Sequence, residues 1–217
     1  MDWGSYAIMA AVVIGAVLGY AWWLGLVMNM KPRFKILHSC EIMYFPYVGS
    51  IDGQLGNEYE CILEDIKKDE ITKHAFDRSK QTTIGLYYDD PMKAKNPDEL
   101  RACLGFIFDP INDNFRDHII NKWGFKHEYF YHRFVPSKTL YGSFSFKYPR
   151  MVAHIAGYHK FYKTYKKFFS RHPELKNDRI SGGYLHIEVY SSSQISYYAP
   201  IQNHKNFDLL AKTGIKK

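Results

Sequence analysis

The sequence lacks the patterns that mark metal sites, disulfide frameworks and the common hydrolases. Its three cysteines, Cys40, Cys61 and Cys103, lie far apart and include no CxxC pair, so neither a disulfide framework nor a zinc site of familiar spacing is indicated. The ten histidines form no HExxH motif, and the chain has no GxSxG motif and no glycine-rich phosphate loop. We therefore expect reduced thiols, no metal, no cofactor and no enzyme activity.

Formal charge is also missing from the first part of the chain. The segment from Trp3 to Met30 has 28 residues without a charged side chain, and as a helix it would extend over about 42 Å, more than the roughly 30 Å hydrocarbon core of a bilayer. Trp3, Tyr6 and Trp22 place rings near its two ends, where they suit the water interface. The sequence predicts a membrane anchor in residues 1–30, with a span at about 6–28.

The charges that flank this segment predict its orientation. Lys31 and Lys35 follow it closely, whereas Asp2 is the early charge, so by the positive-inside tendency the rest of the chain faces the cytosol. A cleaved signal peptide is the alternative, although signal peptides usually have a positively charged N-terminal region and a shorter apolar core. Gly15 and Gly19 have the GxxxG spacing of helix-pairing faces. Such pairing would form a dimer.

The part after the anchor is basic and rich in aromatic residues. It carries 29 − 21 = +8 charges, because Asp2 is the one acid before Lys31. A basic domain held near a bilayer would be drawn to an anionic leaflet. An ordinary solvated surface and nucleic acid are the other interpretations, and no recognisable nucleic-acid module is present.

Hydrophobic periodicity predicts an α+β domain over residues 31–202, followed by a short tail at 203–217. Apolar alternation predicts strands, and apolar residues at three- and four-residue steps predict amphipathic helices. The first half is predicted to contain a strand at 34–48, a helix at 54–73, strands at 82–88 and 100–108, and a connecting helix at 111–123. The second half is predicted to contain extended segments at 125–134 and 137–146, a helix at 151–169, and strands at 184–190 and 195–201. Each half therefore has the order β-α-β-β, and the two are expected to share one antiparallel sheet with a groove between them.

Four short motifs carry a resemblance to a known family. They are IGLYYDDP at 84–91, RACLG at 101–105, KWGF at 122–125 and LHIEVY at 185–190, and FPYVG at 45–49 resembles the turn before the family's first helix. In this order they resemble the cytosolic domain of the testis-expressed protein 264 family. The broader family is the gyrase-inhibitor-like domain, for which the resemblance implies the same doubled β-α-β-β fold.

The resemblance also implies a function and a location. It implies a single-pass adaptor of the endoplasmic-reticulum membrane that acts as a reticulophagy receptor by binding the ubiquitin-like modifiers of autophagy. It further implies the autophagosome and nuclear envelope as locations, the valosin-containing AAA ATPase as a partner, and contact with nucleic acid that is indirect at most. The receptor family carries a long acidic tail with its modifier-binding motif, and the sequence ends here at Lys217, so we expect that this element is missing.

Two places match the aromatic-x-x-aliphatic form that such modifiers dock as an added strand. Phe207 and Leu210 lie in the tail, whereas Tyr59 and Ile62 lie in a predicted helix. The first pair is the candidate motif. The alternative for Phe207 and Leu210, which we favour, is packing on the domain.

A groove in the sheet would have one carboxylate candidate. Glu188 alternates with Ile187 and Val189 in a predicted strand, so its side chain points to the opposite face. By the resemblance of some gyrase-inhibitor-like domains to sensors of cationic aromatic compounds, and of a few to hydrolases, Glu188 with Tyr87 and Tyr190 is the candidate ligand groove. A solvent-facing or salt-bridged Glu188 is the alternative. A groove protein of this kind, binding or hydrolytic, on the same anchor is the alternative to the adaptor.

Overall fold

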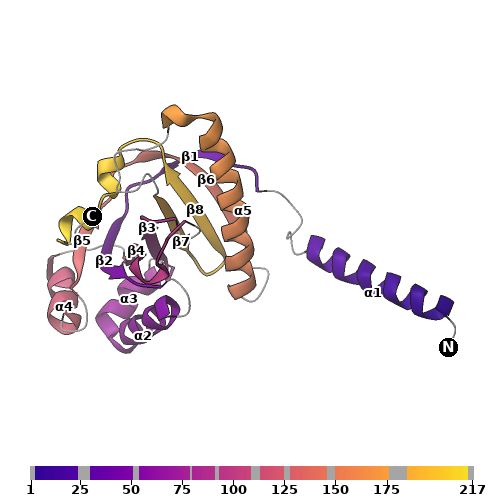
Figure 1. The fold of residues 1–217 in the computed structure, drawn as a ribbon. Coiled ribbons are helices and arrows are strands. Elements are labelled where there is room, and N and C mark those ends of the chain that lie inside the picture. Colours follow the sequence, from indigo (N-terminus) through magenta and orange to yellow (C-terminus); the bar gives the residue numbers. More distant parts are fainter. Residues whose placement is uncertain are drawn as a thin grey trace.

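The computed structural model describes residues 3–23, 30–50, 54–78, 80–90, 93–108, 113–124, 128–145, 150–175 and 185–214. In these ranges an apolar N-terminal helix is followed by an α+β domain with one eight-stranded sheet (Figure 1). The predicted fold class is confirmed.

The apolar helix α1, Trp3–Trp23, stands apart from the domain (Figure 1). Its stretch Trp3–Tyr20 has a mean hydropathy of 1.6, and none of it is buried. The 21 residues of the helix extend over about 31 Å, which matches the hydrocarbon core of a bilayer. The helix is thus long and apolar enough to cross a membrane, and a signal sequence near an N-terminus would share these properties.

The strands of the sheet are all paired antiparallel. They are β1 (Arg33–Leu37), β2 (Glu41–Val48), β3 (Thr83–Tyr87), β4 (Arg101–Ile107), β5 (Phe130–Arg133), β6 (Ser137–Ser145), β7 (His186–Tyr190) and β8 (Gln194–Pro200). Their order across the sheet is β1-β6-β8-β7-β3-β4-β2-β5. The two halves meet where β7 pairs with β3.

This order shows the predicted repeat. The triplet β6-β8-β7 of the second half mirrors the triplet β2-β4-β3 of the first. The predicted first strand at 34–48 is instead two strands, and β1 crosses to pair with β6 of the other half. In the same way β5 crosses to pair with β2. The two crossing connections touch, because the Phe134 amide donates to the Cys40 carbonyl oxygen over 2.9 Å.

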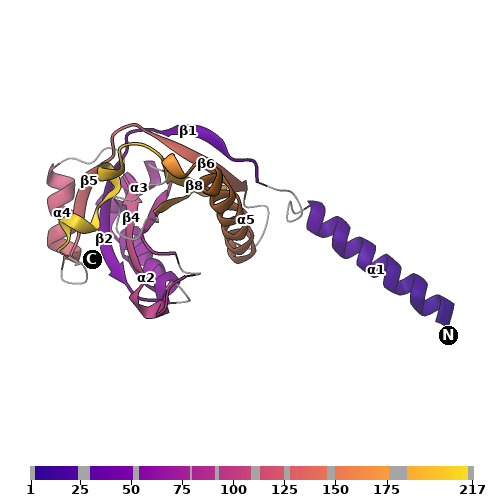
Figure 2. The same ribbon diagram turned by 45° about the horizontal axis from the view of Figure 1, so that its top comes forward.

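Four helices cover one face of the sheet. They are α2 (Gln54–Lys68), α3 (Glu70–Arg78), α4 (Asp113–Trp123) and α5 (Arg150–Arg171). The first three lie over the first half, and α5 lies over β6 and β8 (Figures 1 and 2). Aromatic rings make many of these contacts. Phe76 of α3 and Phe115 of α4 pack in one cluster with Phe106 of β4, and Phe161 of α5 stacks on Tyr197 of β8 at 5.1 Å between ring centroids. Such aromatic pairs supply much of the buried area of a core.

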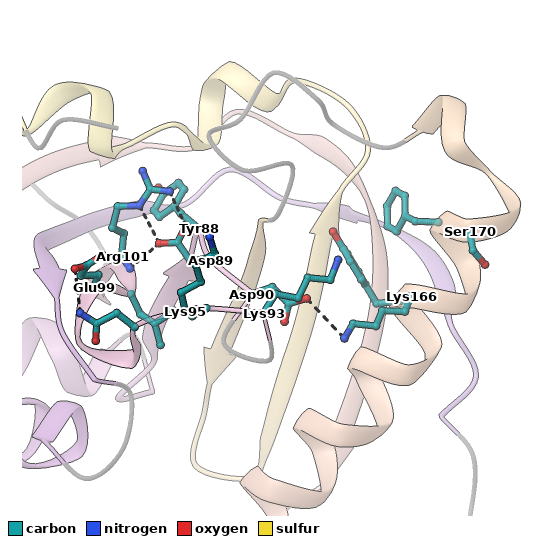
Figure 3. A pocket seen from close by; sticks show the side chains of 14 residues that line it. Tyr88, Asp89, Asp90, Lys93, Lys95, Glu99, Arg101, Lys166 and Ser170 are labelled. Atoms are coloured by element: carbon teal, nitrogen blue, oxygen red, sulfur yellow. Dashed lines mark hydrogen bonds and ion pairs between the residues drawn. The ribbon is translucent and has the colours of Figure 1, made fainter.

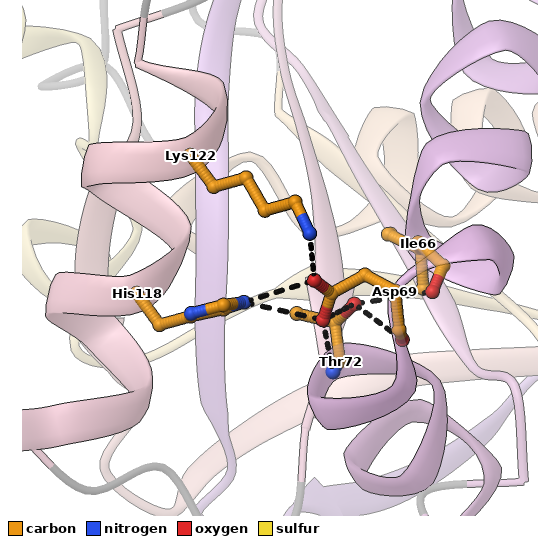
Figure 4. A network of polar contacts seen from close by, with 5 residues as sticks. All are labelled: Ile66, Asp69, Thr72, His118 and Lys122. Atoms are coloured by element: carbon orange, nitrogen blue, oxygen red, sulfur yellow. Dashed lines mark hydrogen bonds and ion pairs between the residues drawn. The ribbon is translucent and has the colours of Figure 1, made fainter.

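The helix predicted at 54–73 is broken in two at Asp69. The Asp69 side chain accepts a hydrogen bond from the Thr72 amide over 3.0 Å and so caps α3. It also accepts from the Thr72 hydroxyl, and it contacts His118 Nε2 at 3.1 Å and Lys122 Nζ, both on α4 (Figure 4). Burial raises the pKa of Asp69, but the bonds from Lys122, Thr72 and His118 outweigh this and hold that pKa well below its usual value. A buried carboxylate therefore ties three helices together.

The C-terminal segment covers the opposite face of the sheet. Short 3₁₀ turns at His204–Phe207 and Leu210–Lys212 place Phe207, Leu209 and Leu210 against β2, β3 and β7. Phe207 and Leu209 are fully buried. The Tyr88 hydroxyl donates to the Phe207 carbonyl oxygen over 2.8 Å and accepts from the Leu209 amide over 3.2 Å. The segment is therefore part of the core.

Several predicted ends lie outside the described residues. These are residues 24–28 of the span, 111–112 of the connecting helix, 125–127 and Phe146 of the extended segments, Tyr184, and residues 215–217 of the tail.

Candidate functional site

The predicted groove residues lie together at the centre of the sheet. Glu188 of β7 is opposite Gly85 of β3 on one side and Tyr197 of β8 on the other. Period-two alternation puts His186, Glu188 and Tyr190 on one face, opposite Ile187 and Val189, as the sequence predicts for Glu188. In the structure this is the face that the helices cover. The Glu188 side chain is only 2% exposed, so the place is closed by its neighbours and is no open groove in this structure.

A hydrogen-bonded relay surrounds this carboxylate. Glu188 Oε1 lies 3.0 Å from His186 Nε2, and Oε2 accepts a hydrogen bond from the Tyr190 hydroxyl. The Tyr162 hydroxyl of α5 lies 2.7 Å from His186 Nδ1 and 3.1 Å from Nε2. If Nε2 carries the proton that Glu188 accepts, Nδ1 can accept the proton of Tyr162. Each polar group is then satisfied, as a buried network requires.

Tyrosine rings close this polar cluster from the helix side. The Tyr87 ring stacks on His186 with 4.7 Å between centroids and an angle of 13°. Burial, and next the charge of Glu188, raise the pKa of Tyr87 and of Tyr190 well above the usual value. Burial does the same for Tyr197. These hydroxyls stay protonated at neutral pH, so they serve as donors and are poor bases or nucleophiles.

His186 and Tyr162 were missed by the sequence analysis. His186 carried a signal, because the alternation that sets Glu188 opposite to Ile187 and Val189 puts His186 on the same face as Glu188. Tyr162 lies on the apolar stripe of α5, and its periodicity indicates only a core position. Its meeting with His186 depends on how α5 packs on the sheet.

An open cavity lies next to this cluster, between the loop from β3 to β4 and the C-terminal half of α5. Its volume is about 600 Å³, which is in the usual range for small-molecule sites. Tyr165 and Phe169 of α5 supply rings, Tyr88 lies beside the cavity after β3, and Lys93 and Lys95 lie on the loop (Figure 3). The sequence analysis assigned none of these residues to a site, because the cavity arises only where loop and helix approach.

Two ion pairs fix the walls of the cavity. Arg101 forms a bidentate pair with Asp89, with Nε to Oδ2 at 2.8 Å and Nη2 to Oδ1 at 2.5 Å, a geometry that holds both planes rigidly. Lys166 Nζ of α5 lies 3.6 Å from Asp90 Oδ2 and so connects helix and loop (Figure 3). The two pairs neutralise these four residues.

Metal ligands and reactive thiols are the other candidate site features among the described residues. No group of three His, Cys, Asp or Glu side chains within the described ranges could hold a metal ion. Cys103 is buried and Cys40 partly buried, and burial raises the pKa of Cys40 to about 11 and that of Cys103 to about 12. Cys61 is exposed on α2.

The candidate modifier motif is not accessible. Phe207 is fully buried and Leu210 is 5% exposed, and the segment forms 3₁₀ turns instead of the extended form that an added strand needs. Tyr59 and Ile62 face the core from α2, where the Tyr59 hydroxyl donates to the Ile84 carbonyl oxygen over 2.7 Å.

Comparisons with known proteins give similarity of structure but not of sequence. No family model matches the chain, and no curated protein matches it. It is similar to SAV2435 bound to tetraphenylphosphonium, with a TM-score of 0.44 and 9% identity over 81% of this chain and 96% of that one. It is also similar to a hydrolase from Listeria innocua, with a TM-score of 0.48 and 12% identity over 79% and 92%. A third is EcmrR in its complex with DNA, with a TM-score of 0.47 and 10% identity over 91% and 67%.

Proposed function

We propose that the chain is a membrane-anchored binding protein whose domain takes a small anionic ligand with an aromatic or acyl part in the cavity beside α5. The cavity of about 600 Å³ between that helix and the loop after β3 is the observation that carries the proposal. It joins apolar walls with a few fixed polar groups, as ligand pockets do.

The charges around the cavity favour an acidic ligand. Asp89 and Asp90 are each neutralised by a cation, whereas Glu99 keeps its charge and accepts a hydrogen bond from Asn96 over 3.0 Å. One carboxylate therefore stands against the two rim lysines Lys93 and Lys95. Lys93 and Lys95 are exposed on the rim. An acidic group could bind these two lysines while its apolar part contacts Tyr165 and Phe169.

The chemistry of the neighbouring cluster supports binding over catalysis. A tyrosine acts as a base or nucleophile when its pKa is lowered, whereas burial raises the pKa of Tyr87 and Tyr190. We propose that Glu188, His186 and Tyr162 hold α5 on the sheet at the inner end of the site.

Calorimetry with naphthalenesulfonate, an anionic aromatic probe, tests the ligand site on the protein in nanodiscs, with empty nanodiscs as the blank. We expect saturable binding that weakens about tenfold, roughly 1.4 kcal/mol, when Lys93→Glu and Lys95→Glu are combined. The matched control reverses Lys67 and Lys68 on α2, which are also exposed, and should leave the affinity unchanged. Equal loss in both double variants would contradict the cavity as the site.

The same titration with ethidium, a cationic aromatic dye, separates this site from the Glu188 groove. A cation that entered between the tyrosines would bind to Glu188, and its binding would disappear in Glu188→Gln. That result, together with no binding of naphthalenesulfonate, would show that the ligand site is the Glu188 groove and not the cavity.

Anchoring by α1 has its own test. If α1 crosses the endoplasmic-reticulum membrane with the domain in the cytosol, the protein resists alkaline carbonate, and a protease added to sealed microsomes digests the domain. A chain that carbonate releases, or that sealed microsomes protect, would exclude this part of the proposal.

A receptor for autophagy modifiers is the second function that we propose, because the exposed apolar helix α1 would hold the domain on a membrane. Docking through Phe207 and Leu210 would require their segment to leave the sheet. Pull-down with the modifiers should therefore fail for Phe207→Ala combined with Leu210→Ala. Leu209→Ala is the matched control, since Leu209 is equally buried but outside the motif. No capture by the intact protein would remove direct receptor activity.

A further inference from the structure

Cations gather on the outer side of α5 and on the neighbouring strand β6. Helix α5 contains six Lys and Arg residues and β6 contains Lys138, and neither element has an Asp or Glu. On α5, Lys160, Lys163, Lys167 and Arg171 recur at three- and four-residue steps, so they lie along one stripe. The stripe points away from the sheet, because the opposite side of the helix is buried.

Apolar side chains border this stripe. Phe34 is 55% exposed and Ile36 is 52% exposed on β1, which is an edge strand. The Phe34 ring contacts the Phe168 ring of α5 at 5.7 Å between centroids, and Lys138 Nζ lies 5.0 Å from the Phe34 ring. We call the stripe together with Phe34, Ile36 and Lys138 the basic face. Native proteins usually protect an exposed edge strand that carries apolar residues, for example by covering it with another element.

The chain itself keeps the basic face near the end of α1. Met30 packs with the α5 core, and the Thr164 hydroxyl of α5 lies 3.4 Å from the Met30 carbonyl oxygen. Only residues 24–29 separate Met30 from the last residue of α1, and seven extended steps reach at most roughly 25 Å. Wherever α1 ends, α5 is close by.

We infer that the basic face lies on the anionic leaflet of the membrane that holds α1. Lysines bind lipid phosphates and carboxylates, the exposed Phe34 and Ile36 enter the boundary with the acyl chains, and the bilayer covers the free edge of β1. Lys166 is excluded from this contact because it pairs with Asp90 at the cavity. The inference rests on the proposed anchoring by α1, which the carbonate test decides separately.

The experiment places one fluorescent NBD group on full-length protein in liposomes whose lipids have brominated chains that quench it. Ser170 is exposed, next to the stripe and far from α1 in sequence, so Ser170→Cys in a Cys61→Ser background reports contact of α5. The native Cys61 on α2 provides the control label. Cys40 and Cys103 react little at neutral pH, because burial raises the pKa of each.

We expect at least about twofold more quenching of the α5 label in liposomes that contain phosphatidylserine than in phosphatidylcholine alone, since the attraction is electrostatic. The Cys61 label should show no such difference. Lys163→Glu with Lys167→Glu should remove the difference, and Lys67→Glu with Lys68→Glu should preserve it.

Equal quenching in both lipids, or quenching that survives reversal of Lys163 and Lys167, would overturn the inference while leaving the anchor intact. Binding of a DNA or RNA duplex that the same reversal abolishes, without lipid-dependent quenching, would also overturn it in favour of nucleic acid. Release of the protein by carbonate would point instead to failure of the anchor.

Discussion

The two halves of the domain have the same order of elements but hold their helices in different ways. In the first half, α2 has four acids against two lysines, and the helix is broken at Asp69, whose carboxylate bonds to α3 and α4. In the second half, α5 runs unbroken over 22 residues with no acid, and rings hold it on the sheet. One fold thus tolerates a buried polar network on one side, Asp69 with His118 and Lys122, which we call the polar lock, and aromatic packing on the other.

This difference teaches which part of the domain depends on charge. A buried carboxylate contributes stability only while it is ionised and paired, whereas stacked rings contribute at every pH. The helices of the first half should therefore be sensitive to loss of Asp69 and to acid, and the packing of α5 in the second half to changes in shape.

Removal of the polar lock should have the largest effect. Asp69→Ala loses the cap of α3 and the bonds to His118 and Lys122, and we expect the free energy of unfolding to fall by about 3 kcal/mol. Urea denaturation measures the change, and hydrogen exchange should place it in α3 and α4. Asp77→Ala on the exposed side of α3 is the control. Similar losses for both variants would show that no lock exists.

Acid should weaken the first half through the same residue. Because the folded state holds the pKa of Asp69 below its usual value of 3.8, its contribution is complete above that value and is lost as the pH falls below it. The stabilities of wild type and Asp69→Ala should then converge under acid. A constant difference between their urea midpoints from neutral pH to below pH 3.8 would contradict this account.

The centre of the sheet should respond next. Glu188→Gln keeps the shape but leaves either the His186 or the Tyr190 donor without its carboxylate acceptor, so we expect a loss of about 2 kcal/mol. Because β7 pairs with β3, exchange should rise in both halves. Glu174→Gln, at a side chain 64% exposed, is the control. A loss confined to β7 and β8 would show that the centre does not couple the halves.

A smaller change should follow from altered packing of α5. A Cβ at Gly157 would collide with the Tyr197 hydroxyl, and overpacking of this kind costs about 2 kcal/mol. It outweighs the roughly 1 kcal/mol gained when alanine replaces a helical glycine, so Gly157→Ala should lower the free energy of unfolding by about 1 kcal/mol. Ser170→Ala, exposed on the same helix, should not destabilise. An increase in melting temperature for Gly157→Ala would show that the Tyr197 side chain moves aside at little cost.

The smallest change should come from an exposed charge pair of the first half. Lys68 and Glu64 on α2 lie 3.4 Å apart with side chains 71% and 70% exposed, and such pairs contribute at most about 0.5 kcal/mol. Lys68→Ala should thus leave the urea midpoint nearly unchanged. A loss comparable to that of Asp69→Ala would mean that the whole acidic surface of α2, and not the buried lock, stabilises this half.

Much of the fold could be predicted because it depends on local patterns. Alternation in 185–190 sets Glu188 opposite to Ile187 and Val189, and the three- and four-residue steps of 151–169 predict α5. The break at Asp69 could not be predicted, since the apolar pattern continues through it and the partners His118 and Lys122 lie about fifty positions away. The division of the first strand into β1 and β2 depends likewise on pairing with β6.

The sequence by itself determined the apolar N-terminal helix, the doubled β-α-β-β order and the orientation of Glu188 opposite to Ile187 and Val189, because these follow from the residues next to one another in the chain. Only the tertiary structure decided that Tyr162 meets His186 above Glu188, that Phe207 and Leu210 are buried, and that a loop and a helix enclose a cavity. Each of these depends on contacts between distant segments, and local periodicity does not encode the distances between them.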